Sequence, residues 1–324
     1  SGRGRSPRVG DRLTDRRHRL APALVAAAVG VILAGGVVVL RRDGDAPPPA
    51  PPPAGVEVLA AGDVASCETE TDEKTARLLD GQPGTVLVLG DTVYDDGTAA
   101  EFRRCYAPTW GRHRHRSRPV PGNHDYGDDE GGDDRGSGYF GYFGKAAGTE
   151  GEGWYSYDLG SWHLVALNSN CRRIGGCQAG SAQERWLRAD LAANTARCTL
   201  AYWHHPFVSS GRKHGGTPAM ASLWRALFEH GADVVLSGHE HNYERFAPLD
   251  VEGRPASSAG MRQFVVGTGG GEKLYRFGAP KPGSEFRDDD TYGVLRLRLL
   301  DGAYEWRFLP AGDGSSDHGR GSCR

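Results

Sequence analysis

Five short apolar runs lead into side chains that can bind a metal ion. The runs read as buried β-strands, and glycine precedes the polar residue in four of the five cases. They are VEVLAAG before Asp63, TVLVLG before Asp91, RPVPG before Asn123, CTLAYW before His204 and DVVLSG before His239. Since loops beyond the carboxyl ends of strands hold the ligand in open α/β sheets, we expect these five side chains to line one pocket.

Strands and helices alternate along the chain from residue 56 onward. Ser181, followed by Glu184, forms the capping-box pattern of a helix start, and Gly231 stands where a second helix should end. Tyr292 opens an alternating apolar and charged run that turns at Asp301-Gly302, which predicts an antiparallel hairpin. Strands are predicted over 56–60, 85–89, 162–168, 198–203, 233–237 and 263–267, and helices over 181–194 and 217–231. We therefore expect a layered α/β fold with antiparallel additions, in one domain over 56–324.

The N-terminal region has a different composition. Residues 20–40 contain no charged side chain, and this length can cross a bilayer as a helix. Seven arginines in the segment 1–19 and two after the run predict a cytoplasmic N-terminus, with the rest of the chain outside the membrane. Residues 41–55 form a proline-rich linker. We favour an uncleaved anchor. The alternative is an export signal, of the twin-arginine or another type, whose cleavage would give a secreted protein.

Charge and cysteine content narrow the function. Beyond Arg42 the chain has 30 Lys and Arg against 39 Asp and Glu, so its formal charge of −9 argues against a nucleic-acid partner. All six cysteines lie beyond the apolar run, where an even number in an oxidising compartment predicts disulfides. Cys171 and Cys177 are near enough to close a small loop, although six cysteines allow 15 pairings. The sequence does not indicate an oligomeric state.

The mixture of side chains points to hard and intermediate metal ions. Tyr94 follows Asp91 by three residues and adds a phenol to the carboxylates, imidazoles and amide. Such a set suits trivalent iron with a divalent partner, whereas thiolates would favour softer metals. Two metal ions about 3.5–4 Å apart can share one carboxylate and hold a phosphoryl oxygen between them.

The ordered motifs GDVA (62–65), GDTVY (90–94), GNHD (122–125), WHHP (203–206) and GHEH (238–241) resemble those of the calcineurin-like metallophosphoesterases, and within them the purple acid phosphatases. This resemblance implies a sandwich of two mixed β-sheets flanked by helices. It also implies that Asp63, Asp91, Tyr94 and His241 hold Fe(III), with Asp91 bridging. Asn123, His204 and His239 would complete the site of a divalent metal (Fe, Zn or Mn). His124 and His214 would contact substrate phosphate, and a histidine would protonate the leaving alcohol.

The resemblance implies a phosphatase that hydrolyses small phosphate esters by attack of a metal-bound hydroxide, and the apolar run with its flanking arginines predicts that it is exported and membrane-anchored. Two alternatives remain: a phosphodiesterase or nucleotide hydrolase on the same centre, and a catalytically silent binding module. Other members of the superfamily have Asp-x-His at the first motif, where this chain has Asp63-Val64-Ala65, and Tyr94 could replace that missing ligand. His205 is expected to pack or to touch substrate, because H-x-P spacing assigns His204 as the ligand and neighbours on a strand face opposite ways.

Overall fold

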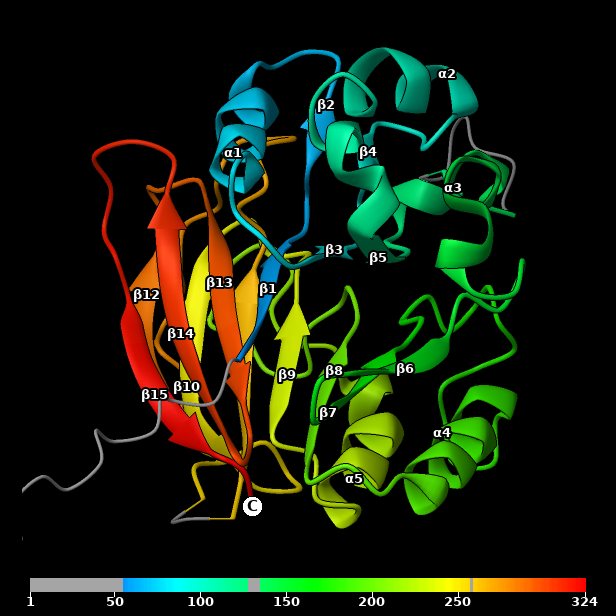
Figure 1. The fold of residues 1–324 in the computed structure, drawn as a ribbon, viewed down its shortest axis with the longest axis vertical. Helices are drawn as coiled ribbons and strands as arrows, with labels where there is room; N and C mark the ends of the chain where they lie inside the picture. The colour runs from blue at the N-terminus through cyan, green and yellow to red at the C-terminus, as the bar shows by residue number, and fades with distance from the viewer. Residues whose placement is uncertain (1–54, 128–134, 257–258) are drawn as a thin grey trace, which may run out of the picture. The chain divides into compact units, whose positions relative to one another are not determined.

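The computed structural model describes residues 55–127, 135–256 and 259–324 (Figure 1). The predicted Arg-rich segment 1–19, the anchor at 20–40 and the linker up to residue 54 lie outside these ranges. Within the described ranges, every helix is too short or too polar to cross a membrane.

One sheet has six strands in the order β15-β14-β13-β1-β3-β5. Strands β1, β3 and β5 are parallel, so their carboxyl ends meet at one edge of the sheet. Strand β13 runs antiparallel to β1 and begins the C-terminal meander of β13, β14 and β15. The strands are β1 (Val56–Ala61), β3 (Thr85–Leu89), β5 (Ser117–Val120), β13 (Gly293–Leu300), β14 (Ala303–Pro310) and β15 (His318–Ser322).

The second sheet has seven strands in the order β12-β10-β11-β9-β8-β7-β6. Its central strands β7, β8, β9 and β11 are parallel, and the flanking strands are antiparallel. The strands are β6 (Tyr155–Leu159), β7 (Trp162–Ala166), β8 (Cys198–Tyr202), β9 (Val234–Ser237), β10 (Tyr243–Leu249), β11 (Met261–Val266) and β12 (Ser284–Asp288). A small parallel pair, β2 (Ala65–Ser66) and β4 (Val93–Tyr94), follows the ends of β1 and β3.

Helices lie outside the sheets (Figure 1). They are α1 (Thr71–Leu79), α2 (Ala99–Glu101), α3 (Ser137–Phe143), α4 (Ala182–Ala193) and α5 (Ala221–Glu229). One buried cluster between the sheets includes Leu59, Leu87, Leu295 and Phe264, and a second lies under α4 and α5. The two mixed sheets with outer helices confirm the predicted architecture. Apolar residues on the inner strand faces of both sheets are buried, as expected for such a layered fold.

The predicted elements agree with the structure to within a few residues. Ser181 caps α4 by accepting the N–H of Glu184 at 3.3 Å. The carboxylate of Glu184 accepts the N–H of Gly180 rather than that of Ser181, so only half of the predicted capping box forms. Helix α5 ends at Glu229, two residues before Gly231, which adopts a φ of 81°. The hairpin of β13 and β14 turns at Asp301-Gly302 as predicted.

All six cysteines form disulfides. Cys171–Cys177 closes the small loop suggested by the sequence, and the other pairs are Cys67–Cys105 and Cys198–Cys323. The last pair joins the start of β8 to the C-terminus across a separation of 125 residues. Closing so long a loop lowers the entropy of the unfolded chain, which stabilises the fold.

Candidate metal centre

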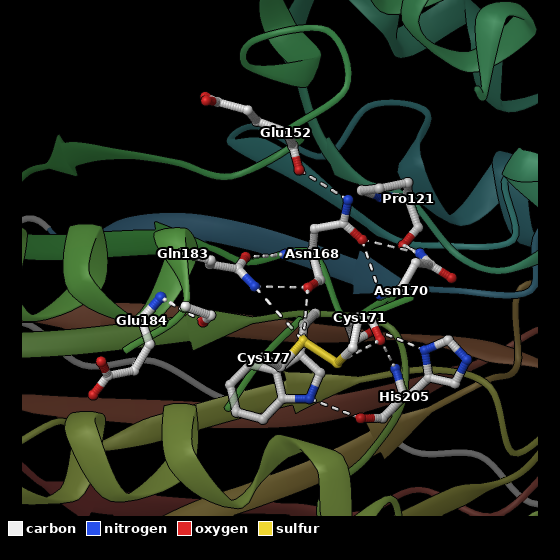
Figure 2. Close-up of a disulfide and its surroundings, with 12 residues drawn as sticks. Pro121, Glu152, Asn168, Asn170, Cys171, Cys177, Gln183, Glu184 and His205 are labelled. Carbon is white, nitrogen blue, oxygen red and sulfur yellow. Dashed lines mark hydrogen bonds between the residues drawn. A yellow bond between two sulfur atoms is a disulfide. The ribbon is translucent and has the colours of Figure 1, made fainter. Parts of the chain in front are cut away.

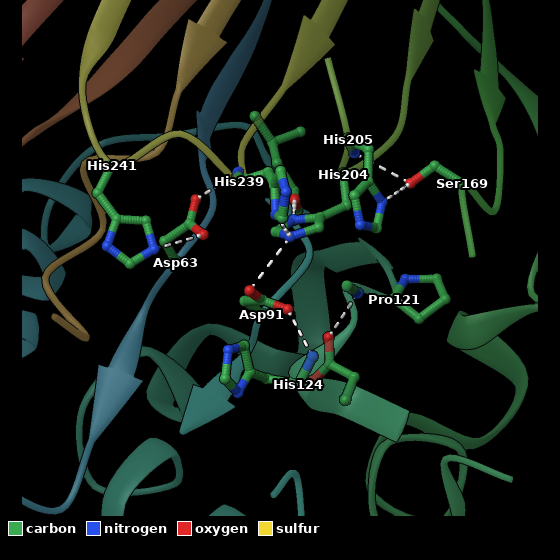
Figure 3. A network of polar contacts seen from close by, with 12 residues as sticks. Asp63, Asp91, Pro121, His124, Ser169, His204, His205, His239 and His241 are labelled. Carbon is green, nitrogen blue, oxygen red and sulfur yellow. Dashed lines mark hydrogen bonds and ion pairs between the residues drawn. The ribbon is translucent and has the colours of Figure 1, made fainter. Parts of the chain in front are cut away.

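The five strand ends meet where the two sheets come together (Figure 3). Asp63, Asp91 and Asn123 follow β1, β3 and β5 of the first sheet, and His204 and His239 follow β8 and β9 of the second. The N–H of Gly62 donates to the carbonyl of Val266 at 2.9 Å and so ties the first sheet to the second. Ligand atoms of Asp63, Asp91 and His204 lie within 4.8 Å of one another, and Nδ1 of His239 lies 3.1 Å from Nε2 of His204. The predicted convergence is therefore present for these four side chains.

Three residues of this group have a strained backbone. Asp63, Asp91 and His239 have φ values of 60°, 45° and 70°, and they are the non-glycine residues with positive φ among those described. Such conformations cost of order 1–3 kcal/mol each and persist where the surroundings fix them, typically at functional sites. Their restriction to these three positions sets this cluster apart from the rest of the described chain.

Glycine precedes four of the five strand-end residues, and at two of these glycines a side chain would collide with the cluster. A Cβ on Gly122 would lie 2.1 Å from Oδ1 of Asp91, and one on Gly238 would lie 2.7 Å from Oδ2 of Asp63. Both contacts are shorter than real Cβ atoms show, so glycine is the residue that lets neighbouring loops approach the carboxylates.

The hydroxyl of Tyr94 lies in the middle of the proposed iron ligands. Its oxygen is 3.0 Å from Oδ1 of Asp63, 3.2 Å from Oδ2 of Asp91 and 3.0 Å from Nε2 of His241. Burial, with the charges of Asp63 and Asp91, holds the pKa of this phenol well above its usual value of 10. In the metal-free site the phenol therefore keeps its proton.

Backbone carbonyls orient two of the histidines. His204 donates from Nδ1 to the carbonyl of Leu89 at 2.9 Å, and His241 donates from Nδ1 to the carbonyl of Lys273 at 3.1 Å. Each histidine then directs Nε2 toward the cluster. This arrangement, with the outer nitrogen donating to a carbonyl, is the usual way in which a protein orients metal-binding imidazoles.

The ligand atoms of His204, Asp91 and His239 lie close together and would be stabilised by a positive charge between them. Nε2 of His204 lies 3.1 Å from Oδ2 of Asp91 and 3.1 Å from Nδ1 of His239. Burial is the largest single effect and lowers the pKa of His204, but the charge and hydrogen bond of Asp91, with smaller contributions from Asp63 and the Leu89 carbonyl, together raise it to about 9. Without a metal the site thus gains a proton. Oδ1 of Asn123 is buried and has no hydrogen-bond partner among the described residues, which fits a metal ligand.

The two predicted substrate histidines lie next to the cluster. The backbone N–H of His124 donates to Oδ1 of Asp91 at 2.9 Å, and its ring Nδ1 donates to the carbonyl of Asp95 at 2.6 Å. The ring of His214 packs on that of His239, with centroids 4.2 Å apart. Burial and the charge of Lys213 lower the pKa of His214.

The structure adds residues that the sequence did not identify. The ring of Tyr275 stacks on His241 with centroids 4.0 Å apart. Glu240 is fully buried and accepts the N–H groups of His214 and Gly215, which fixes the loop that carries His214. Asp125 accepts the N–H groups of Thr92 and Gly122 and joins the loops after β3 and β5. Only Asp125 and Glu240 had a sequence signal, since they lie inside the GNHD and GHEH motifs.

His205 lies closer to the cluster than strand alternation implied. Its ring centroid is 4.3 Å from that of His239, and a nitrogen of each of His204, His205 and His239 lies within 4.8 Å of the others. The alternation argument does not apply at this position, because β8 ends at Tyr202 and residues beyond it need not face opposite ways.

Comparison with known proteins agrees with this geometry. The family model for calcineurin-like phosphoesterases matches residues 56–243. Purple acid phosphatase 22 of Arabidopsis thaliana is 35% identical over 160 residues, 46% of this chain and 35% of its own length. Purple acid phosphatase 21 of the same plant is 33% identical over 156 residues, 46% of this chain and 34% of its own. The chain thus spans about a third of the length of these relatives.

A solved structure supports the fold. The purple acid phosphatase PPD1 of yellow lupin has a TM-score of 0.66 at 20% identity, covering 82% of this chain and 53% of the lupin chain. At this identity the likeness concerns the fold alone. The match of the family model over more than half of the chain shows that this protein belongs to the calcineurin-like phosphoesterase family.

Proposed function

We propose that this protein is a metal-dependent phosphatase of the purple acid phosphatase type, acting on small phosphate monoesters at a two-metal centre. Asp63, Asp91, Tyr94 and His241 would hold Fe(III). Asp91 would be shared with a divalent Fe, Zn or Mn ion held also by Asn123, His204 and His239. The observation that carries the proposal is the position of the Tyr94 hydroxyl, within 3.2 Å of a ligand atom of Asp63, Asp91 and His241.

The donor set favours iron at the site of Tyr94. Burial and two carboxylates raise the pKa of the Tyr94 phenol, so its ionisation needs a strongly charged cation, and hard oxygen ligands with imidazole suit Fe(III). When bound, the two ions would supply an activated water and neutralise charge on the phosphoryl group.

The histidines beside the ligands supply the proton and the phosphate contacts. His124 donates from Nδ1 to the carbonyl of Asp95, which orients its ring beside the cluster, and we assign to it the protonation of the leaving alcohol. His214 would bind a phosphoryl oxygen from the opposite side of the cluster, next to His239. Glu240 holds the backbone of His214 in place.

We also propose that the catalytic domain works outside the cytoplasm. Three disulfides account for all six cysteines, which suits an oxidising compartment. The apolar run 20–40 would anchor the protein in the membrane, or would be removed as a signal to give a secreted form.

The test is purification of the full chain from iron-supplemented cells, followed by metal analysis, visible spectroscopy and assay of 4-nitrophenyl phosphate beside its bis ester. We expect bound iron and faster hydrolysis of the monoester. Preference for the diester or for nucleotides would favour the phosphodiesterase alternative. A protein that binds metal but hydrolyses none of these substrates would be a binding module, and the proposal would fail.

A further inference from the structure

His205 lies beside the proposed metal ligands His204 and His239, although it is not one of the predicted ligands. Its ring lies beside those of His204 and His239, at centroid distances of 4.8 and 4.3 Å. One ring nitrogen, Nδ1, contacts Oγ of Ser169 at 2.7 Å (Figure 3). Among the described residues, no hydrogen-bond partner contacts the other nitrogen, Nε2.

Two contacts between Ser169 and His205 bear on which ring nitrogen of His205 carries the proton. The backbone N–H of His205 donates to Oγ of Ser169 at 3.0 Å, so this oxygen is already an acceptor. The serine hydroxyl has one proton, and Nδ1 of His205 is the acceptor within reach. Donation from the serine to Nδ1 gives the serine O–H an acceptor, and in this arrangement a neutral His205 keeps its proton on Nε2. In this tautomer Nε2 is a donor and cannot bind a metal ion.

The segment that carries Ser169 is fixed by buried polar contacts (Figure 2). Gln183 of α4 holds Asn168 by two hydrogen bonds: its Oε1 accepts the Asn168 N–H at 2.7 Å, and its Nε2 donates to the Asn168 carbonyl at 2.8 Å. Asn170 donates from Nδ2 to the carbonyl of Pro121 at 3.0 Å, which ties the segment to the loop that carries Asn123. The Cys171–Cys177 disulfide closes the chain directly after it.

We propose that His205 donates a hydrogen bond from Nε2 to the phosphoryl group of the substrate, and that Ser169 is a positioning residue that fixes this tautomer. The role of His205 rests on the proposed phosphatase function, whereas the tautomer does not. The chemistry that Nε2–H recognises is an anionic phosphoryl oxygen beside the divalent site, because a donor surrounded by His204 and His239 has no acceptor there until substrate or product binds.

The first test measures the tautomer directly. Long-range ¹H–¹⁵N spectra of the ¹⁵N-histidine-labelled, metal-free full chain report which ring nitrogen of His205 is protonated, with assignment by His205→Gln. We expect Nε2–H in the wild type and a mixture of tautomers in Ser169→Ala. Ser156→Ala is the matched control, because Ser156 of the neighbouring strand β6 donates one hydrogen bond to Asp190 of α4 and does not contact His205. An Nδ1–H tautomer in the wild type would overturn the proposal.

The second test measures orthophosphate binding to the metal-loaded protein by calorimetry, with metal content determined on the same samples. His205→Leu should weaken binding about 10–100-fold with both metals retained, as expected for loss of a hydrogen bond to a charged group. His205→Gln should stay within about threefold, because its amide can donate from a similar position. Ser169→Ala should fall between the two.

The outcomes separate this inference from the proposed function. Unchanged phosphate affinity in His205→Leu would remove His205 from substrate binding, even in an active phosphatase. Loss of a metal ion in His205→Leu would make His205 a ligand instead. Weakened binding in a protein that hydrolyses no ester would uphold the inference while the proposed function fails.

Discussion

The hydroxyl oxygen of Tyr94 lies 3.0 Å from Oδ1 of Asp63, a residue 31 positions earlier in the chain. This contact brings the phenol to the carboxylate that we assign to iron. A phenolate bound to Fe(III) absorbs visible light by charge transfer. We therefore expect the iron-loaded protein to be coloured, and Tyr94→Phe to lose the visible band while keeping its fold, since the ring still fills the same buried space.

Spectra of the two proteins, with iron measured on each, decide this prediction. Tyr275→Phe is the control, because its ring stacks on His241 while its hydroxyl donates to Glu272 instead. A colourless wild type that is fully active with zinc or manganese alone would contradict the iron assignment.

Asn123 provides a test of the second metal. Its Oδ1 is buried and has no hydrogen-bond partner among the described residues, so a metal ion is the partner that we propose. Asn123→Ala should lower the metal content from two ions to one and reduce kcat/KM. Asn123→Asp keeps an oxygen in place and should retain both ions. Two ions bound to Asn123→Ala would exclude this residue as a ligand.

His124 should contribute to the reaction without binding metal. Its ring is turned toward the carbonyl of Asp95, while its backbone N–H contacts Asp91. His124→Ala should lower kcat by about 10²–10⁴, the usual scale for loss of a general acid. Metal content should be unchanged. The control is His115→Ala, at an exposed histidine, which should leave kcat at the wild-type value. Loss of metal from His124→Ala would instead identify His124 as a metal ligand.

The predicted topology can be tested in intact cells. Seven arginines before the apolar run 20–40 and two after it predict that the catalytic domain lies outside the cytoplasmic membrane. Protease added to intact cells should remove residues 56–324 from the anchor. Protection until lysis would show that the orientation is wrong, and a soluble form that begins after residue 40 would indicate a cleaved signal.

The sequence predicted the parts of the site that depend on local pattern. Asp63, Asp91 and His239 each follow a strand and a glycine, and those glycines are required because their neighbours leave no space for a Cβ. Strand alternation could not place His205, because that rule ends with the strand at Tyr202. It also could not connect Ser169 to His205, since 36 residues separate them and their contact depends on how β7 and β8 pair.

The sequence also could not predict which residues pair with most of the cysteines or with Tyr275. Cys171–Cys177 was suggested by its short separation, whereas Cys198–Cys323 depends on where the C-terminal strand β15 ends. The ring of Tyr275 stacks on His241, and the backbone N–H of Tyr275 donates to the His241 carbonyl at 2.7 Å. Spacing in the sequence carries no signal for such a contact.

His163, on β7, gives a prediction about stability and pH. It contacts Asp190 of α4 through Nε2 and Asp158 of β6 through Nδ1, both at 2.8 Å. The hydrogen bond to Asp190 outweighs burial and raises the pKa of His163 above its usual 6.5. A pKa that is higher in the folded state favours the protonated form of the fold, so the stabilisation is complete below the unfolded pKa and is lost as pH rises through the folded one.

Replacing His163 should therefore cost more stability in mild acid than in base. We expect His163→Gln to be less stable than the wild type, with the difference in the free energy of unfolding larger at about pH 5.5 than at about pH 8.5. Urea denaturation at both pH values measures it. His115→Gln is the control, because this exposed histidine makes no ion pair among the described residues, and its effect should be small at both. A difference for His163→Gln that grows toward high pH would mean that His163 is neutral in the fold, and that these hydrogen bonds join β6, β7 and α4 without a charge on the ring.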